Sequence, residues 1–152
     1  MNRLRYPPFY LRREKVMYRK ILVPVDLSAT EKAERMLRKA ETLLDDGGEI
    51  ILLNVVEDLP NYLAIDVPVD IIENAIRDAR TRLADLATRA TVTARTDIRS
   101  GAPAREIIAA ADEHHADLII IASHTPDFTN YFIGANADRV VRHAKCSVLV
   151  DR

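Results

Sequence analysis

An aspartate and a short polar segment are the residues of this sequence best placed to do chemistry. Asp26 follows an apolar run that starts at Tyr18, and Ser123-His124-Thr125 follows a second apolar run, Leu118–Ala122. A carboxylate can accept hydrogen bonds from sugar hydroxyls. A turn between a strand and a helix presents unpaired backbone N–H groups to an anion. The two together suit a nucleotide, with its ribose at the carboxylate and its phosphates at the amides.

Other kinds of site are less well supported by the residue pattern. His124 stands alone, because no side chain nearby in the sequence forms the pair of nucleophile and base that covalent catalysis requires. Asp26 could instead be a charge that stabilises the start of a helix, and Asn136 could be a turn residue. The single cysteine, Cys146, lies in an apolar run and is expected to be a small buried side chain. We find no metal-binding constellation and assign no catalytic residue.

The composition limits the class of protein. A chain of 152 residues with 48% hydrophobic and 30% charged residues suits one soluble domain. The formal net charge of −1 gives no electrostatic reason to expect nucleic acid or a membrane surface as a partner. No apolar run is long enough to span a bilayer. One cysteine excludes an internal disulfide, so we expect a cytoplasmic protein.

Apolar runs and helical periodicity alternate along the chain and predict its elements. The predicted strands are Tyr18–Val25, Ile50–Val56, Val92–Ile98, Leu118–Ala122 and Cys146–Val150. The predicted helices run from Ser28 to Asp45-Asp46-Gly47-Gly48, and over Asp66–Ala90, Pro103–His115 and Ala135–His143. We expect residues 1–17 to be a disordered N-terminal extension and residues 18–152 to form one domain.

Two details of these helices are specific enough to be checked. Ser28 and Glu31 have the spacing of a capping box, which would close the start of the first helix. The helix over Asp66–Ala90 carries apolar residues at helical spacing, which we expect to be buried on one face: Val69, Ile72, Ala75, Ile76, Ala79, Leu83 and Leu86.

The alternation of elements predicts an α/β fold and the position of its ligand site. Strands that alternate with helices form a parallel sheet with helices on both faces, which is a Rossmann-like architecture. Right-handed crossovers leave few arrangements, and the natural strand order is 3-2-1-4-5. Winding reverses between the first and fourth strands, where ligands bind at the carboxyl ends. This places Asp26 beside Ser123-His124, with the Gly134 turn nearby.

At five places the residues resemble those of the universal stress protein family. The resemblance runs from about Tyr18 to the C-terminus, and its segments occur in the order in which that family has them. They are Lys20–Ser28, Leu53–Val56, Gly101–Pro103, Ile119–His124 and Gly134–Val150. Each segment alone is short, but five in the same order are specific. The resemblance implies a small α/β domain that often forms a homodimer by pairing its last strands, here Cys146–Val150.

Many members of that family bind ATP through a Gly-x2-Gly-x9-Gly-Ser/Thr loop after the fourth strand, and this sequence departs from it. Ala122 or a neighbour and Thr125 stand at the first two glycine positions, Gly134 comes one residue early, and Ala135 replaces the hydroxyl residue. Residues other than glycine restrict how closely the backbone approaches a phosphate. The Ser-His-Thr-Pro-Asp segment with a shortened loop nevertheless resembles a subgroup in which nucleotide binding is still expected.

The resemblance and the predicted topology together give a set of ligand-binding residues for ATP, with or without Mg²⁺. Val55 would lie under the adenine ring and contact it through its backbone, although a plain core valine is an equally open interpretation. The predicted set is Pro24, Val25, Asp26, Val55, Ala122, Ser123, His124, Thr125, Gly134, Ala135 and Asn136.

Four functions can be compared on this basis. The leading hypothesis is a cytoplasmic homodimer that binds ATP as a regulatory ligand and is not a fast enzyme. A second is an interaction module of the same fold that has lost nucleotide binding, which Ala122, Thr125 and Ala135 favour. A third is a very weak ATPase, although no residue is placed to activate water. A phosphate-accepting receiver domain is rejected, because it needs an acidic pair after the first strand and an aspartate after the third.

Overall fold

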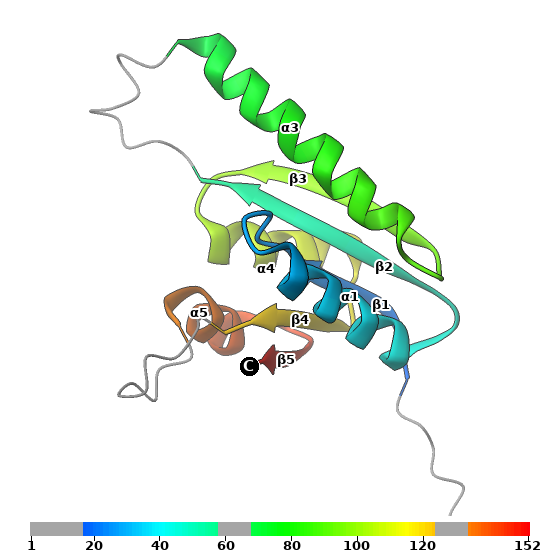
Figure 1. Cartoon of the computed structure of the whole chain (residues 1–152). Helices are drawn as coiled ribbons and strands as arrows, with labels where there is room; N and C mark the ends of the chain where they lie inside the picture. The colour runs from blue at the N-terminus through cyan, green and yellow to red at the C-terminus, as the bar shows by residue number, and fades with distance from the viewer. Residues whose placement is uncertain (1–16, 58–67, 124–133) are drawn as a thin grey trace, which may run out of the picture.

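The computed structural model of the chain describes residues 17–57, 68–123 and 134–152. Figure 1 shows the arrangement of the elements in space. In chain order they are β1 (Tyr18–Pro24), α1 (Thr30–Leu43), β2 (Leu44–Val56), α3 (Val69–Thr88), β3 (Ala94–Ser100), α4 (Pro103–His114), β4 (Leu118–Ala122), α5 (Ala135–His143) and β5 (Ser147–Asp151).

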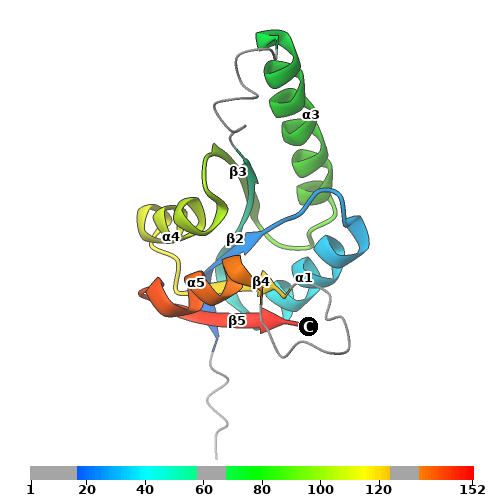
Figure 2. The same ribbon diagram turned by 90° about the vertical axis from the view of Figure 1, so that its left-hand side faces the viewer.

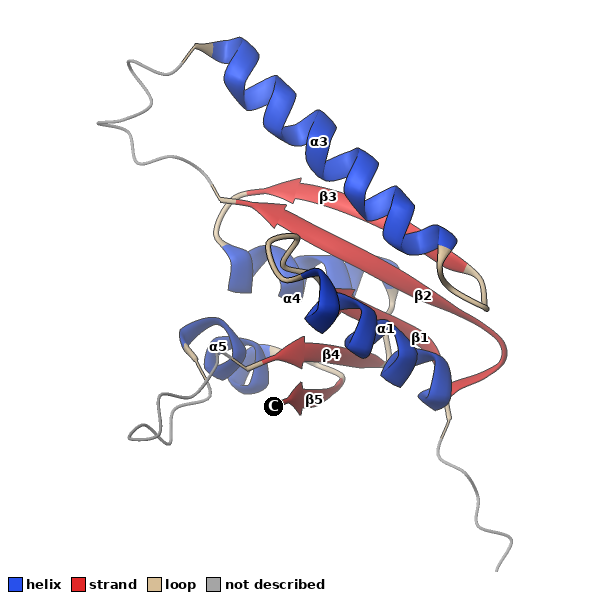
Figure 3. Ribbon diagram, viewed as in Figure 1, coloured by secondary structure: helices blue, strands red, loops and turns tan. Residues whose placement is uncertain are grey.

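The five strands form one parallel sheet in the order β3-β2-β1-β4-β5, which confirms the predicted fold and strand order. In Figure 3 the labelled arrows of β2, β3, β4 and β5 point to the same side. The central strand β1 pairs with β4 through Ile21↔Leu118 and Leu22↔Ile119. Since β1 and β4 are neighbours, the winding reverses between them, and their carboxyl ends lie at one edge of the sheet.

Two apolar layers lie on the two faces of the sheet, because successive residues of a strand point to opposite sides. On one face, Ile21 and Val23 of β1 pack with α1 and α3. On the other face, Leu22 of β1 packs with α4 and α5. Figure 2 shows the two pairs of helices on either side of the sheet. A strand buried on both faces explains the continuous apolar runs in the sequence.

The start of α1 differs from the prediction. The N-cap residue is Ala29, and no side chain caps the helix, so the predicted capping box is wrong. The Ser28 amide and hydroxyl both donate to Asp26 Oδ1, at 2.9 and 2.6 Å. Asp26 thus takes the Ser28 amide that the capping box would pair with the Glu31 carboxylate, and a local Asx-type turn replaces the cap.

The end of α1 also differs from the prediction. The helix stops at Leu43 and β2 begins at Leu44, well before the predicted Ile50. Gly47 takes its positive φ of 77° within an irregularity of β2, where the pairing with β1 shifts between Tyr18 and Lys20. Gly48 allows this strand to lie close to β1, because a Cβ there would be 2.7 Å from the Arg19 carbonyl oxygen. The glycines therefore shape the strand instead of ending the helix.

The predicted apolar face of α3 is confirmed only in its second half. Ala79, Leu83 and Leu86 are buried, but Val69 is 71% exposed and Ile72 is 39% exposed. Figure 2 shows the N-terminal end of α3 extending away from the other elements. Helical spacing shows which side of a helix is apolar, but not how far along the helix the sheet reaches.

The remaining boundaries shift by a few residues. β1 ends at Pro24, β3 spans Ala94–Ser100, α4 ends at His114, and β5 spans Ser147–Asp151. Pro103 starts α4 as predicted, and β4 and α5 have the predicted bounds. Residues 1–16 of the expected extension, the expected helix start at Asp66, and the site residues His124 and Thr125 lie outside the described residues.

Candidate functional site

The carboxyl ends of β1, β2 and β4 bring most of the predicted ligand-binding residues to one edge of the sheet, which we call the mouth. Asp26 comes two residues after the end of β1, and Ser123 comes directly after the end of β4, the strand that pairs with β1. Pro24 pairs with Leu53, which places Val55 at the same edge on β2. The mouth is therefore the switch point at which ligands of doubly wound sheets bind.

Asp26 presents an ionised carboxylate at this mouth. Its Oδ1 accepts both hydrogen bonds from Ser28, whereas Oδ2 has no partner among the residues that the structure describes. The hydroxyl and the amide of Ser28 lower the pKa of the Asp26 carboxyl, against a smaller opposing effect of burial, and the positive charge of Lys32 lowers it further. One oxygen therefore holds the loop in shape and the other is left to accept from a ligand.

Ser123 is fixed at the end of β4 by its backbone. Its N–H donates to the Asp151 carbonyl oxygen at 2.7 Å, and its own carbonyl oxygen accepts from Lys32 Nζ at 2.7 Å. Ser123 is buried and Ala122 before it is half-buried. Lys32 thus reaches across from α1 to the mouth, which the sequence prediction missed.

Asn54 fixes the β1 side of the mouth. Its Nδ2 donates to the Val25 carbonyl oxygen at 3.0 Å, and the Val25 amide donates to the Leu53 carbonyl oxygen at 2.7 Å. Val25 is buried in the layer under α1 and α3. Val55 is half-buried and its side chain packs against the opposite layer, under α4 and α5. If Val55 contacts a ligand at the mouth, it therefore does so through its backbone.

The first turn of α5 lies beyond the arrowhead of β4 (Figure 1). Gly134 is the N-cap, with φ 92° and ψ 143°, a conformation that side chains disfavour. Ala135 and Asn136 are exposed and no side chain caps the helix. The first amides of a helix have no intrahelical partner, so those of Ala135 and Asn136 are available to an acceptor.

A buried carboxylate supports the mouth from behind. Asp151, at the end of β5, is 2% exposed and forms ion pairs with Lys39 and with Arg35, whose Nη2 lies 3.0 Å from Oδ2. Burial alone would raise the pKa of this carboxyl, but the hydrogen bonds and charges of Lys39 and Arg35 outweigh burial and lower it. Because the Asp151 backbone also holds Ser123, β4, β5 and α1 meet here.

Comparison with known proteins now places the chain. The sequence model of the universal stress protein family matches residues 17–152. The chain belongs to the universal stress protein family. It is similar to universal stress protein G of Shigella flexneri, with 31% identity over 142 residues that cover 90% of this chain and 100% of the relative.

Solved structures of other universal stress proteins have the same fold. Universal stress protein UspA from Lactobacillus plantarum superposes with a TM-score of 0.61 at 29% identity, covering 90% of this chain and 99% of that one. A universal stress protein solved in complex with cAMP and one from Archaeoglobus fulgidus solved with dAMP give TM-scores of 0.58 and 0.57, each at 19% identity, and cover 90% of this chain. At 19% identity the likeness shows the fold alone.

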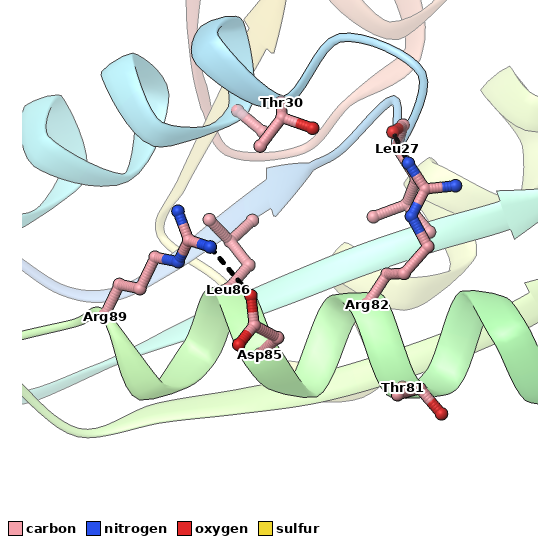
Figure 4. Close-up of a pocket in the computed structure, with 8 residues that line it drawn as sticks. Leu27, Thr30, Thr81, Arg82, Asp85, Leu86 and Arg89 are labelled. Atoms are coloured by element: carbon pink, nitrogen blue, oxygen red, sulfur yellow. Dashed lines mark hydrogen bonds and ion pairs between the residues drawn. The ribbon is translucent and has the colours of Figure 1, made fainter.

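This universal stress protein also has a cavity of about 390 Å³ between α1 and α3, which is lined in part by Leu27, the residue after Asp26 (Figure 4). Its charged residues are already paired: Arg82 donates to the Leu27 carbonyl oxygen, and Arg89 bonds to Glu34 and to Asp85. Its lining is Leu27, Thr30, Ala33, Thr81, Arg82, Asp85, Leu86 and Arg89. The paired arginines tie α3 to α1 and to the loop after Asp26, which is a structural role.

Within residues 17–57, 68–123 and 134–152 of this universal stress protein, no group of three or more His, Cys, Asp or Glu side chains could hold a metal ion. The same residues include no helix that is both long and apolar enough to cross a membrane. Cys146 is half-buried, and burial raises the pKa of its thiol, which keeps it protonated and unreactive.

Proposed function

We propose that this universal stress protein binds an adenine nucleotide, ATP, as a regulatory ligand at the mouth. The observation that carries the proposal is the Asp26 carboxylate at the switch point of the sheet, whose Oδ2 has no partner among the described residues. The ribose hydroxyls would donate to Asp26, and the phosphates would accept from the amides of Ala135 and Asn136. Two proteins of the same fold are solved with cAMP and dAMP, which makes adenine a reasonable choice.

The other predicted residues take supporting roles in this proposal. Pro24 and Val25 set the end of β1, Val55 offers backbone groups to adenine, and Ala122 and Ser123 bring the chain to the phosphates. Gly134 supplies the positive φ at the start of α5. His124 and Thr125 complete the proposed set. We assign no catalytic residue, and Mg²⁺ would enter with the ATP phosphates, as it commonly does.

Thermal unfolding tests the proposal. ATP–Mg²⁺ at a concentration a hundredfold above its Kd is expected to raise Tm by about 5 to 10 °C, because a ligand bound only to the folded state adds about 2.7 kcal/mol. GTP–Mg²⁺ at the same concentration is the control for base recognition. If ATP gives no shift and no nucleotide copurifies, the alternative is favoured: an interaction module without a nucleotide, as the missing hydroxyl at Ala135 suggests.

We also propose that the protein is a cytoplasmic homodimer in which the β5 strands of two copies pair. Among the strands of the described residues, β5 lies at the edge of the sheet and pairs only with β4, and Val148, Leu149 and Val150 are half-buried there. An uncovered apolar edge promotes aggregation, so a partner strand is expected to cover it. Multi-angle light scattering at micromolar concentration should give twice the mass of one chain. A mass of one chain would contradict the dimer, without bearing on the nucleotide.

A further inference from the structure

The positively charged residues along one side of α1 differ in whether they form ion pairs. Lys32, Arg35 and Lys39 are spaced so that they follow one another on one side of the helix. Arg35 and Lys39 both form ion pairs with the buried carboxylate of Asp151. Lys32 forms no ion pair with any residue in the described ranges, and its only hydrogen bond there is to a neutral carbonyl oxygen, that of Ser123.

The position of Lys32 in its helix is not explained by helix stability. It is the third residue of α1, in the first turn, where the positive end of the helix dipole favours acidic side chains and disfavours cations. Glu31 in the same turn follows the usual preference. A lysine there works against its own helix, and its ammonium group lies at the mouth, beside the Ser123 carbonyl oxygen.

The surroundings of the ammonium group suit a phosphate. Nζ lies 2.7 Å from the Ser123 carbonyl oxygen at the end of β4, and its positive charge is near enough to lower the pKa of the Asp26 carboxyl. A bond from an ammonium to a phosphate oxygen is charge-assisted and stronger than one to a neutral carbonyl. Ala135, at the first turn of α5, brings no hydroxyl to the phosphates. A cation from α1, which lies on the other face of the sheet, would supply the missing attraction at the mouth.

We propose that Lys32 is the residue that binds the phosphates of the nucleotide and makes the mouth prefer ATP over adenosine. This inference rests on the proposed function, because it needs the adenine nucleotide to occupy the mouth. It assigns the two ends of the ligand to two chain segments. The Asp26 carboxylate takes the ribose, and the Lys32 ammonium takes the phosphates.

Calorimetric titration of the full chain with ATP and with adenosine tests the role of Lys32. Lys32→Gln keeps a donor for the Ser123 carbonyl but removes the charge. It is expected to weaken ATP binding about 10- to 100-fold, as the loss of a hydrogen bond between charged groups does. Adenosine binding should change less than about twofold, since adenosine has no phosphate. Lys32→Arg should restore most of the ATP affinity.

Arg38→Gln is the matched control, because Arg38 is an exposed cation on the same helix. It should leave both affinities unchanged, and circular dichroism should show both glutamine variants folded. If Lys32→Gln binds ATP as tightly as the unchanged protein, or loses ATP and adenosine equally, the role of Lys32 is wrong while the proposed function stands. If the unchanged protein binds neither ATP nor adenosine, the proposed function itself is wrong.

Discussion

Replacing Asp151 with asparagine is expected to lower the free energy of unfolding by about 2 to 3 kcal/mol. Breaking a buried ion pair by removing one partner typically costs 3 to 5 kcal/mol (roughly), and the cost is reduced here because Arg35 and Lys39 are half-exposed and can turn to water. The asparagine keeps the shape of the side chain but not its charge. Urea unfolding of both proteins at neutral pH measures the difference.

The stability difference between the unchanged protein and Asp151→Asn should depend on pH. The Asp151 carboxyl has a lowered pKa in the folded protein, so its contribution is fully present above its unfolded pKa, about 4. The contribution is lost as pH falls through the lower, folded value. The difference between the two proteins should therefore shrink in acid.

Asp112→Asn, which removes an exposed partner of Lys145, is the control and should cost about 0.5 kcal/mol or less. A cost for Asp151→Asn as small as that of the control would contradict the role given to this carboxylate.

Replacing Asp26 with asparagine is expected to weaken the binding of both ATP and adenosine about 10- to 100-fold. The charged oxygen that would accept from the ribose becomes neutral, and both ligands carry that ribose. The carbonyl oxygen of asparagine can still accept from Ser28, so the loop after β1 should keep its shape. If Asp26→Asn weakens the binding of both ligands but Lys32→Gln weakens the binding of ATP alone, the ribose contact and the phosphate contact are assigned to different residues.

Asp70→Asn serves as the control for Asp26, because Asp70 is an exposed carboxylate in the first turn of α3. Its replacement should leave both affinities unchanged. Calorimetric titration measures the affinities, and thermal unfolding without ligand should show that each variant is folded. An unchanged affinity of Asp26→Asn for ATP would remove the carboxylate from the proposed site.

The strand order and the position of the mouth could be predicted from the sequence because they depend on few choices. Continuous apolar runs such as Leu118–Ala122 indicate strands buried on both faces, and right-handed crossovers then restrict their order. Asp26 and Ser123 follow the carboxyl ends of two neighbouring strands as a direct result of that order. The positions of both residues could be predicted from the strand order, without knowledge of any side-chain contact.

The errors and omissions concern two kinds of hydrogen bond: those for which neighbouring acceptors compete, and those to backbone groups far away in the sequence. The Ser28 capping box failed because the Asp26 carboxylate, two residues away, accepts from both the amide and the hydroxyl of Ser28. Lys32 and Asn54 were missed because each donates to a backbone carbonyl far away in the sequence, just after the end of a strand, which no residue pattern records. A lysine in the first turn of a helix was nevertheless a visible exception to the dipole preference.

The central place of β1 in the sheet also determines when the chain can fold during its synthesis. β1, α1 and β2 emerge from the ribosome first, yet the other edge of β1 pairs with β4, and the amides of Arg19 and Lys20 bond to Asp117. These partners lie 98 and 97 residues further along the chain. Until they are translated, Ile21 and Leu22 belong to an open, apolar strand edge, which is the kind of surface that chaperones protect in nascent proteins.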